Sequence, residues 1–157
     1  MISNSTLETL IPCNHEEADT RIFIHVKSAI ESGFSDVTVH TVDSDVLCLA
    51  VSVCPHLPGL KQLWVAFGTG KTYKLLPAHE MSTILGPERS QALPMFHAFT
   101  GCDTVSAFAH KGKKTCWSVW NTFNELTETL LQISDSSSAV DQTALDTIER
   151  FVILMYD

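Results

Sequence analysis

The chain has 157 residues, of which 45% are hydrophobic, and its mean hydropathy is +0.12. This length and this share of apolar residues predict one globular unit with a real hydrophobic core. Ten lysines and arginines against eighteen aspartates and glutamates give a net charge of −8, which opposes nonspecific binding of nucleic acid by the whole surface. A polyanionic partner therefore needs a local basic patch or a bound metal ion.

The sequence shows no sign of membrane insertion or secretion. No apolar run approaches the roughly 20 residues that span a bilayer, and the first ten residues lack the charged and long apolar segments of a secretory signal. Five cysteines, at positions 13, 48, 54, 102 and 116, include no C-x-x-C pair. We expect reduced thiols, no membrane partner, and a nuclear or cytoplasmic protein that is not secreted.

The first half of the chain predicts a helix, a strand, a second helix and a β-hairpin. Asn14 is the expected N-cap of the first helix and Gly33 its end. The third element is either a helix or a buried continuation of the strand, and prolines end it. A Gly-Thr-Gly turn joins the two hairpin strands. The elements cover residues 14–33, 36–42, 44–54 and 61–78.

The second half predicts helices separated by glycines, prolines and a serine-rich linker. We expect Pro94 to disturb the second of these helices, and Asp141 to begin the last. Trp117 and Trp120, three residues apart on the third helix, are expected to pack in the core. The four helices cover residues 78–85, 88–100, 113–133 and 141–156.

This order of elements predicts an α/β fold with a small, partly parallel sheet flanked by helices and a mostly helical C-terminal part. Three strands are fewer than the five or so common in such sheets, and the first helix would ordinarily follow an earlier strand. We therefore expect a chain truncated at its amino terminus. We assign residues 1–13 to a disordered or poorly packed N-terminus, 14–134 to the core and 139–157 to a C-terminal helix.

Two further motifs are weak. "FGTGKT" ends like a phosphate-binding loop, but Val65 stands where that loop needs a glycine, and the motif lies between two strands. We therefore expect no nucleotide cofactor. The segments "CNH" (13–15) and "CPH" (54–56) hold zinc-ligand residue types, but at a spacing that is unusual for zinc modules, so we predict no zinc site.

Acidic residues gather at the ends of the predicted elements. Asp43 and Asp45 follow a strand, and in an extended segment their side chains would share a face and repel unless a cation lies between them. Taken singly, acids at these places are explained by helix capping and turns, with Asp45 capping the following helix. Further acids occupy a helix start and a turn, namely Glu16, Glu17, Asp19 and Asp103.

The segments "EADTRIFIHVKSAIESGFSDVTVHTVDSDVLCL" and "HAFTGCDTVSAFAHKGKKT" resemble the internal region of the flap endonuclease branch of PIN-like nucleases, including its Asteroid-related members. The resemblance covers about residues 15–120. It implies that carboxylates bind two divalent cations, Mg²⁺ or Mn²⁺, with Asp43 and Asp45 as catalytic residues. Glu16 stays open as a substitute for Glu17. The implied metal ligands are Glu17, Asp19, Asp43, Asp45 and Asp103.

The same resemblance implies a helix-two-turn-helix segment near residues 101–123, whose lysines contact nucleic-acid phosphates. These residues are Lys111, Lys113 and Lys114. The family's amino-terminal strands, which carry further catalytic aspartates, have no counterpart here. We therefore expect a structure-specific nuclease-like domain of reduced or no activity that acts on DNA rather than RNA. The alternative is a non-catalytic scaffold, derived from a nuclease or mobile element, that binds nucleic acid or protein; the oligomeric state stays open.

Overall fold

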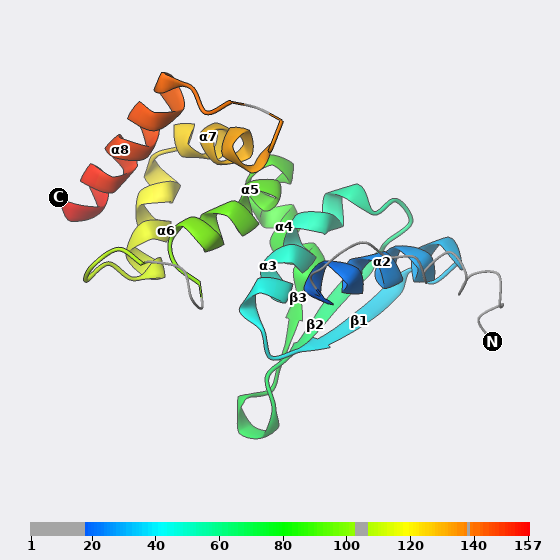
Figure 1. The fold of residues 1–157 in the computed structure, drawn as a ribbon. Coiled ribbons are helices and arrows are strands. Elements are labelled where there is room, and N and C mark those ends of the chain that lie inside the picture. The colour runs from blue at the N-terminus through cyan, green and yellow to red at the C-terminus, as the bar shows by residue number, and fades with distance from the viewer. Residues whose placement is uncertain (1–17, 103–106, 138) are drawn as a thin grey trace. The chain divides into compact units, whose positions relative to one another are not determined.

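The structure, a computed structural model, describes residues 18–102, 107–137 and 139–157 (Figure 1). The chain forms two compact units, the first ending at Leu85 and the second beginning at Gly86, and each is described by itself. The boundary lies inside the range 14–134 that the sequence analysis assigns to one core. The predicted N-cap Asn14 and the N-terminal segment 1–13 lie outside the described residues.

The first unit is an α/β arrangement around a three-stranded mixed sheet with the order β1-β2-β3. Strands β1 and β2 are parallel, whereas β2 and β3 form the predicted antiparallel hairpin. The α/β class and the partly parallel sheet are confirmed. Its elements are α2 (Ala18–Glu31), β1 (Asp36–Thr41), α3 (Ser44–Val53), the 3₁₀ turn η1 (Cys54–His56), β2 (Gln62–Phe67), the 3₁₀ turn η2 (Gly70–Thr72), β3 (Lys74–Pro77) and α4 (Ala78–Leu85).

The core of the first unit lies between one face of the sheet and the helices α2 and α3 (Figure 1). Val39 of β1 is buried opposite Val65 of β2, which is also buried. Side chains alternate along a strand, so the intervening residues of β1 point to the other face and are exposed. The branched apolar residues thus fix which face of β1 meets the helices.

The ends of α2 and α3 follow from their sequence. Gly33 has a φ of +95°, which a glycine adopts at little cost, and its N–H donates to the carbonyl of Ile30. This confirms the predicted end of the first helix. The third element is a helix, and it passes into η1 where Pro55 interrupts the α-helical bonding.

The second unit consists of four helices in the described residues. Pro94 lies inside one of them, and the helix continues beyond it. The predicted single helix over 113–133 is wrong, because the chain breaks after Thr122, where Phe123 leaves the helical conformation and buries its ring. The helices are α5 (Pro87–Phe99), α6 (Lys113–Thr122), α7 (Glu125–Ser134) and α8 (Gln142–Tyr156).

Trp120 is the largest fully buried side chain of the second unit. Its ring stacks on Phe96 with centroids 4.4 Å apart, and its Nε1–H donates to Thr127 Oγ1 at 3.0 Å. The guanidinium of Arg89 lies 4.5 Å from the centroid of the same ring. The prediction that Trp120 packs in the core is therefore confirmed. In the described part of the chain, no helix is both long enough and apolar enough to cross a bilayer.

Candidate functional site

Asp43 is the N-cap of α3. Its backbone is extended, and its Oδ1 accepts a hydrogen bond of 2.8 Å from the backbone N–H of Asp45. The N–H of Asp43 in turn donates to Thr41 Oγ1 at 3.0 Å. These two bonds fold residues 41–45 into a compact turn directly after β1. The expectation that Asp45 caps the helix is wrong, since the cap is Asp43.

Asp45 lies in the first turn of α3, so it does not alternate with Asp43 along a strand. The predicted shared strand face is therefore wrong, because β1 ends at Thr41 and the cap turns the chain into a helix. Both carboxylates lie at the N-terminus of α3, where the helix dipole favours negative charge. The dipole and the cap explain why two acids are tolerated here even without a cation.

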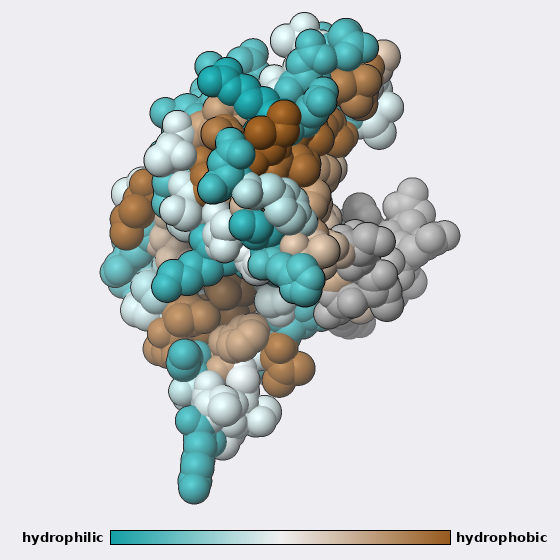
Figure 2. Space-filling model, turned by 90° about the vertical axis from the view of Figure 1, so that its left-hand side faces the viewer, coloured by the Kyte–Doolittle hydropathy of each residue, from teal (hydrophilic) through white to brown (hydrophobic). Residues whose placement is uncertain are grey.

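The turn that carries Asp43 lies beside the loop that joins β2 to β3. The strands β1 and β2 are parallel, so both end at the same side of the sheet, and the N–H of Gly68 donates to the carbonyl of Thr41 at 2.9 Å. A Cβ at Gly68 would lie 2.9 Å from the backbone oxygen of Thr72, so the loop requires a glycine there. The loop extends beyond the sheet, with a hydrophilic tip that includes the exposed Lys71 (Figures 1 and 2).

Asp19 belongs to the same end of the first unit. It occupies the first turn of α2 and is partly buried. A short connection joins α2 to β1, and the two elements run in opposite directions (Figure 1), so the start of α2 lies towards the end of β1. Among the described residues, however, the carboxylate oxygens of Asp19, Asp43 and Asp45 do not all lie within 4.8 Å of one another. The predicted ligands Glu17 and Asp103, and the alternative Glu16, lie outside the described residues.

The three predicted phosphate-binding lysines have different surroundings in the second unit. Lys113 Nζ donates to the carbonyl of His97 at 2.8 Å and to Thr100 Oγ1 at 3.2 Å, at the C-terminal end of α5. Lys111 Nζ lies 5.1 Å from the ring centroid of Tyr156. Lys114 is exposed in the first turn of α6. Lys113 thus has a structural role that the sequence analysis does not foresee.

Tyr156 and Lys71 are further candidate residues that sequence reasoning missed. Tyr156 Oη donates to the carbonyl of Ala109 at 2.9 Å, which ties the end of α8 to the basic segment. Nothing in the sequence near Tyr156 signals this bond, because its partners are 47 residues apart. In the sequence Lys71 belongs only to a weak nucleotide-loop motif, whereas its place after the end of a parallel strand pair is the signal that identifies it.

None of the cysteines in the described residues forms a disulfide bond. Burial raises the pKa of the Cys54 thiol to about 11, and its Sγ donates to the carbonyl of Ala50 at 3.1 Å. Burial also raises the pKa of Cys116. Since the thiolate is the reactive form, these two side chains are poor nucleophiles and poor metal ligands near neutral pH.

Comparisons with family models, with curated proteins and with solved structures find no match to this chain.

Proposed function

We propose that this chain is a PIN-like, divalent-metal-dependent nuclease domain that acts on nucleic-acid phosphodiesters, with reduced or no activity. The observation that carries the proposal is the turn holding Asp43 and Asp45 at the carboxyl end of the parallel pair β1 and β2. In open α/β sheets, functional groups gather beyond this end of the strands. The order of acidic motifs that resembles flap endonucleases supports the same reading.

The donor set suits hard cations, because Mg²⁺ and Mn²⁺ prefer carboxylate oxygens. Asp19, Asp43 and Asp45, together with Glu17 and Asp103, would hold two such ions. When bound, the ions would supply activation of water and stabilisation of the leaving oxygen. Asp43 has one carboxylate oxygen engaged in the cap, and this bond fixes the orientation of the carboxylate at the start of α3.

The partner is DNA in preference to RNA. Lys71 projects from the loop beside the Asp43 turn, and Lys114 is exposed at the start of α6. Exposed lysines contribute sequence-independent affinity by releasing counterions from phosphates. We assign Lys111 a phosphate contact as well, and Lys113 a smaller contribution, because its ammonium group bonds to the end of α5.

A non-catalytic scaffold that binds nucleic acid or protein is the second candidate. The bonds of Asp43 and Lys113 favour it, since each gives a candidate functional side chain a structural role. The two candidates differ in metal dependence. A scaffold binds its partner equally well with or without divalent ions.

The decisive experiment separates the carboxylate of Asp43 from its role as a cap. Asp43→Ser keeps an N-capping side chain and removes the metal ligand, since serine caps about as well as aspartate. We expect the wild-type chain to bind Mn²⁺ in titration calorimetry, and Asp43→Ser to bind it at least tenfold more weakly. Asp141→Ser is the matched control, because Asp141 caps α8 through a 2.8 Å bond from the N–H of Ala144.

Cleavage is measured on a labelled 5′-flap DNA with Mn²⁺. Any activity should fall with Asp43→Ser and with Asp45→Asn, and remain with Asp141→Ser. Equal Mn²⁺ affinity in the wild type and Asp43→Ser would contradict the metal site. Binding of the flap DNA that is unchanged by a chelator would favour the scaffold.

A further inference from the structure

The outer edge of β1 presents unpaired backbone groups in the described part of the chain. The carbonyls of Ser35 and Thr41 accept bonds from β2 and from Gly68, at 3.0 and 2.9 Å. In a parallel ladder, alternate residues bond to one neighbour, so the odd-numbered residues of β1 face β2. The N–H and C=O groups of Asp36, Thr38 and His40 therefore point away from the sheet.

The two edges of this sheet are not equivalent. On β3, Pro77 pairs with Trp64. The backbone groups of Trp64 point towards β1, so those of its partner Pro77 point to the outer edge of β3. Proline has no N–H, so this edge lacks a hydrogen-bond donor at Pro77. A proline and a short strand discourage pairing with another chain. The outer edge of β1 has neither proline nor lysine among Asp36–Thr41. The fold thus blocks one edge and leaves the other able to pair.

The residues along the open edge are self-complementary. Counting outwards from Thr38 in steps of two gives Asp36 and His40, and then Phe34 and Val42. Phe34 and Val42 are 64% and 70% exposed, which is unusual for apolar residues at both ends of one strand. An antiparallel copy centred on Thr38 would place each acid opposite a histidine and each phenylalanine opposite a valine.

We propose that this edge binds a second copy of the chain, forming a two-fold symmetric dimer with one continuous six-stranded sheet. Thr38 pairs with its own counterpart, and Asp36 pairs with His40 of the other copy. Threonine pairs and aromatic pairs with β-branched residues stabilise antiparallel strands. A carboxylate opposite an imidazole can accept a hydrogen bond from its ring N–H. The isologous interface is closed, which ends the assembly at two chains.

A hollow of about 290 Å³ runs along the same edge, between α2 and β1. Ile22, His25 and Val26 of α2 line one wall, and residues 37–40 of β1 line the other. A strand added to β1 would cover the open side of this hollow. The burial of its apolar lining would add to the free energy of the backbone pairing.

The test is the oligomeric state of the full 157-residue chain, by sedimentation equilibrium over a range of concentrations. Thr38→Pro removes an outward N–H and leaves the bonds to β2 intact. We expect the wild-type chain to dimerise and Thr38→Pro to raise the dissociation constant at least tenfold. Leu75→Pro is the matched control, since the backbone N–H of Leu75 points to the outer edge of β3. This variant should dimerise as the wild type does.

An exchange of Asp36 and His40 tests the pairing register. His40→Asp places two acids opposite each other and should weaken the dimer about tenfold, whereas Asp36→His combined with His40→Asp restores the opposite pairing and the affinity. Circular dichroism checks that every variant is folded. A wild-type chain that stays monomeric at the highest concentration would overturn the proposal, whether the edge is covered by residues outside the described part or by another protein. A dimer insensitive to Thr38→Pro or to His40→Asp would overturn it as well.

Discussion

Asp43 and Lys113 are charged side chains that bond to helix ends, Asp43 to an N-terminus and Lys113 to a C-terminus. Their bonding partners lie at different separations along the sequence. Asp43 accepts from an N–H two residues away, at the N-terminus of α3 in the first unit. Lys113 donates to a carbonyl 16 residues away, at the C-terminal end of α5 in the second unit. The carboxylate of Asp43 complements the dipole at the N-terminus of α3, and the ammonium group of Lys113 complements the dipole at the C-terminal end of α5. The bond of Asp43 can form in a short peptide, whereas that of Lys113 requires the fold.

The largest effect is therefore expected at Lys113. Lys113→Met keeps most of the apolar side chain and removes the ammonium group, so the partly buried carbonyl of His97 loses the 2.8 Å bond from Lys113 and keeps the longer 3.5 Å bond from Thr100 Oγ1. We expect the free energy of unfolding to fall by about 2 kcal/mol, the usual range for a hydrogen bond to a charged group. Urea unfolding followed by circular dichroism measures the change.

Lys114→Met is the matched control for this prediction. Lys114 is the next residue along the chain and is exposed, so its replacement should change stability by less than about 0.5 kcal/mol. Equal effects of the two substitutions would show that Lys113 acts only through the general charge of the segment.

The cap at Asp43 is expected to contribute less. Asp43→Ala removes the acceptor for the N–H of Asp45, and should lower the free energy of unfolding by about 1 kcal/mol. Asp141→Ala should cost a similar amount, because Asp141 caps α8 in the same way. Asp43→Ser should retain most of the stability. If serine and alanine cost the same, Asp43 does not act as a cap.

These local bonds explain which parts of the fold the sequence predicts. The strand predicted over 36–42, which the structure has at Asp36–Thr41, the hairpin and the last helix depend on near neighbours along the chain, and all three are confirmed. The break after Thr122 was missed because it depends on the burial of Phe123 in the second unit. No residue at this point is a glycine or proline, so only the tertiary structure reveals the end of the helix.

The candidate site shows the same division. The sequence places Asp43 and Asp45 at the end of a strand, whereas β1 ends at Thr41 and the two acids lie at the start of α3. The sequence did not reveal that a cap folds the two acids into one turn, because the switch from strand to helix occurs within two residues. The bond between Gly68 and Thr41, which brings the Lys71 loop to the same end, depends on the pairing of β1 with β2.

Tyr156 is a second long-range contact, and its effect should be smaller than that of Lys113. Tyr156→Phe removes the bond to the carbonyl of Ala109 and keeps the ring beneath Lys111. Because this bond is exposed and uncharged, we expect a loss of about 0.5–1 kcal/mol in urea unfolding. Tyr73→Phe is the control, since Tyr73 is exposed in the first unit, and it should be neutral. A neutral Tyr156→Phe would show that water replaces the bond.

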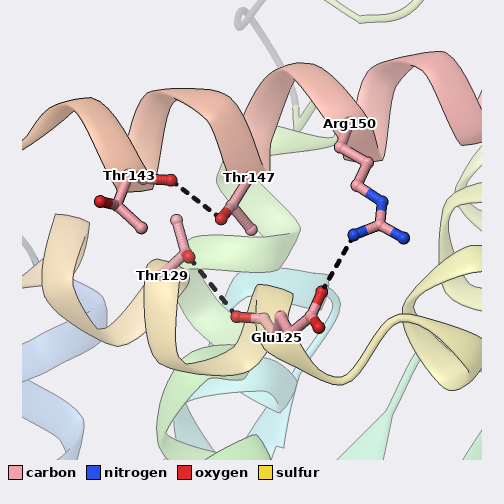
Figure 3. A network of polar contacts seen from close by, with 5 residues as sticks. All are labelled: Glu125, Thr129, Thr143, Thr147 and Arg150. Atoms are coloured by element: carbon pink, nitrogen blue, oxygen red, sulfur yellow. Dashed lines mark hydrogen bonds and ion pairs between the residues drawn. The ribbon is translucent and has the colours of Figure 1, made fainter.

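The smallest effect is expected where charges join two helices on the surface. A guanidinium nitrogen of Arg150 in α8 lies 3.7 Å from Oε2 of Glu125 in α7, and the two side chains are 66% and 69% exposed (Figure 3). Water screens such a pair, so a double-mutant cycle with Glu125→Gln and Arg150→Met should give a coupling energy below about 0.5 kcal/mol. The arginine also lies 5.1 Å from the ring centroid of Phe123, so Arg150→Met alone should cost more than Glu125→Gln. A coupling energy larger than the loss of unfolding free energy expected for Asp43→Ala would contradict the view that exposed charges contribute little to the stability of the fold.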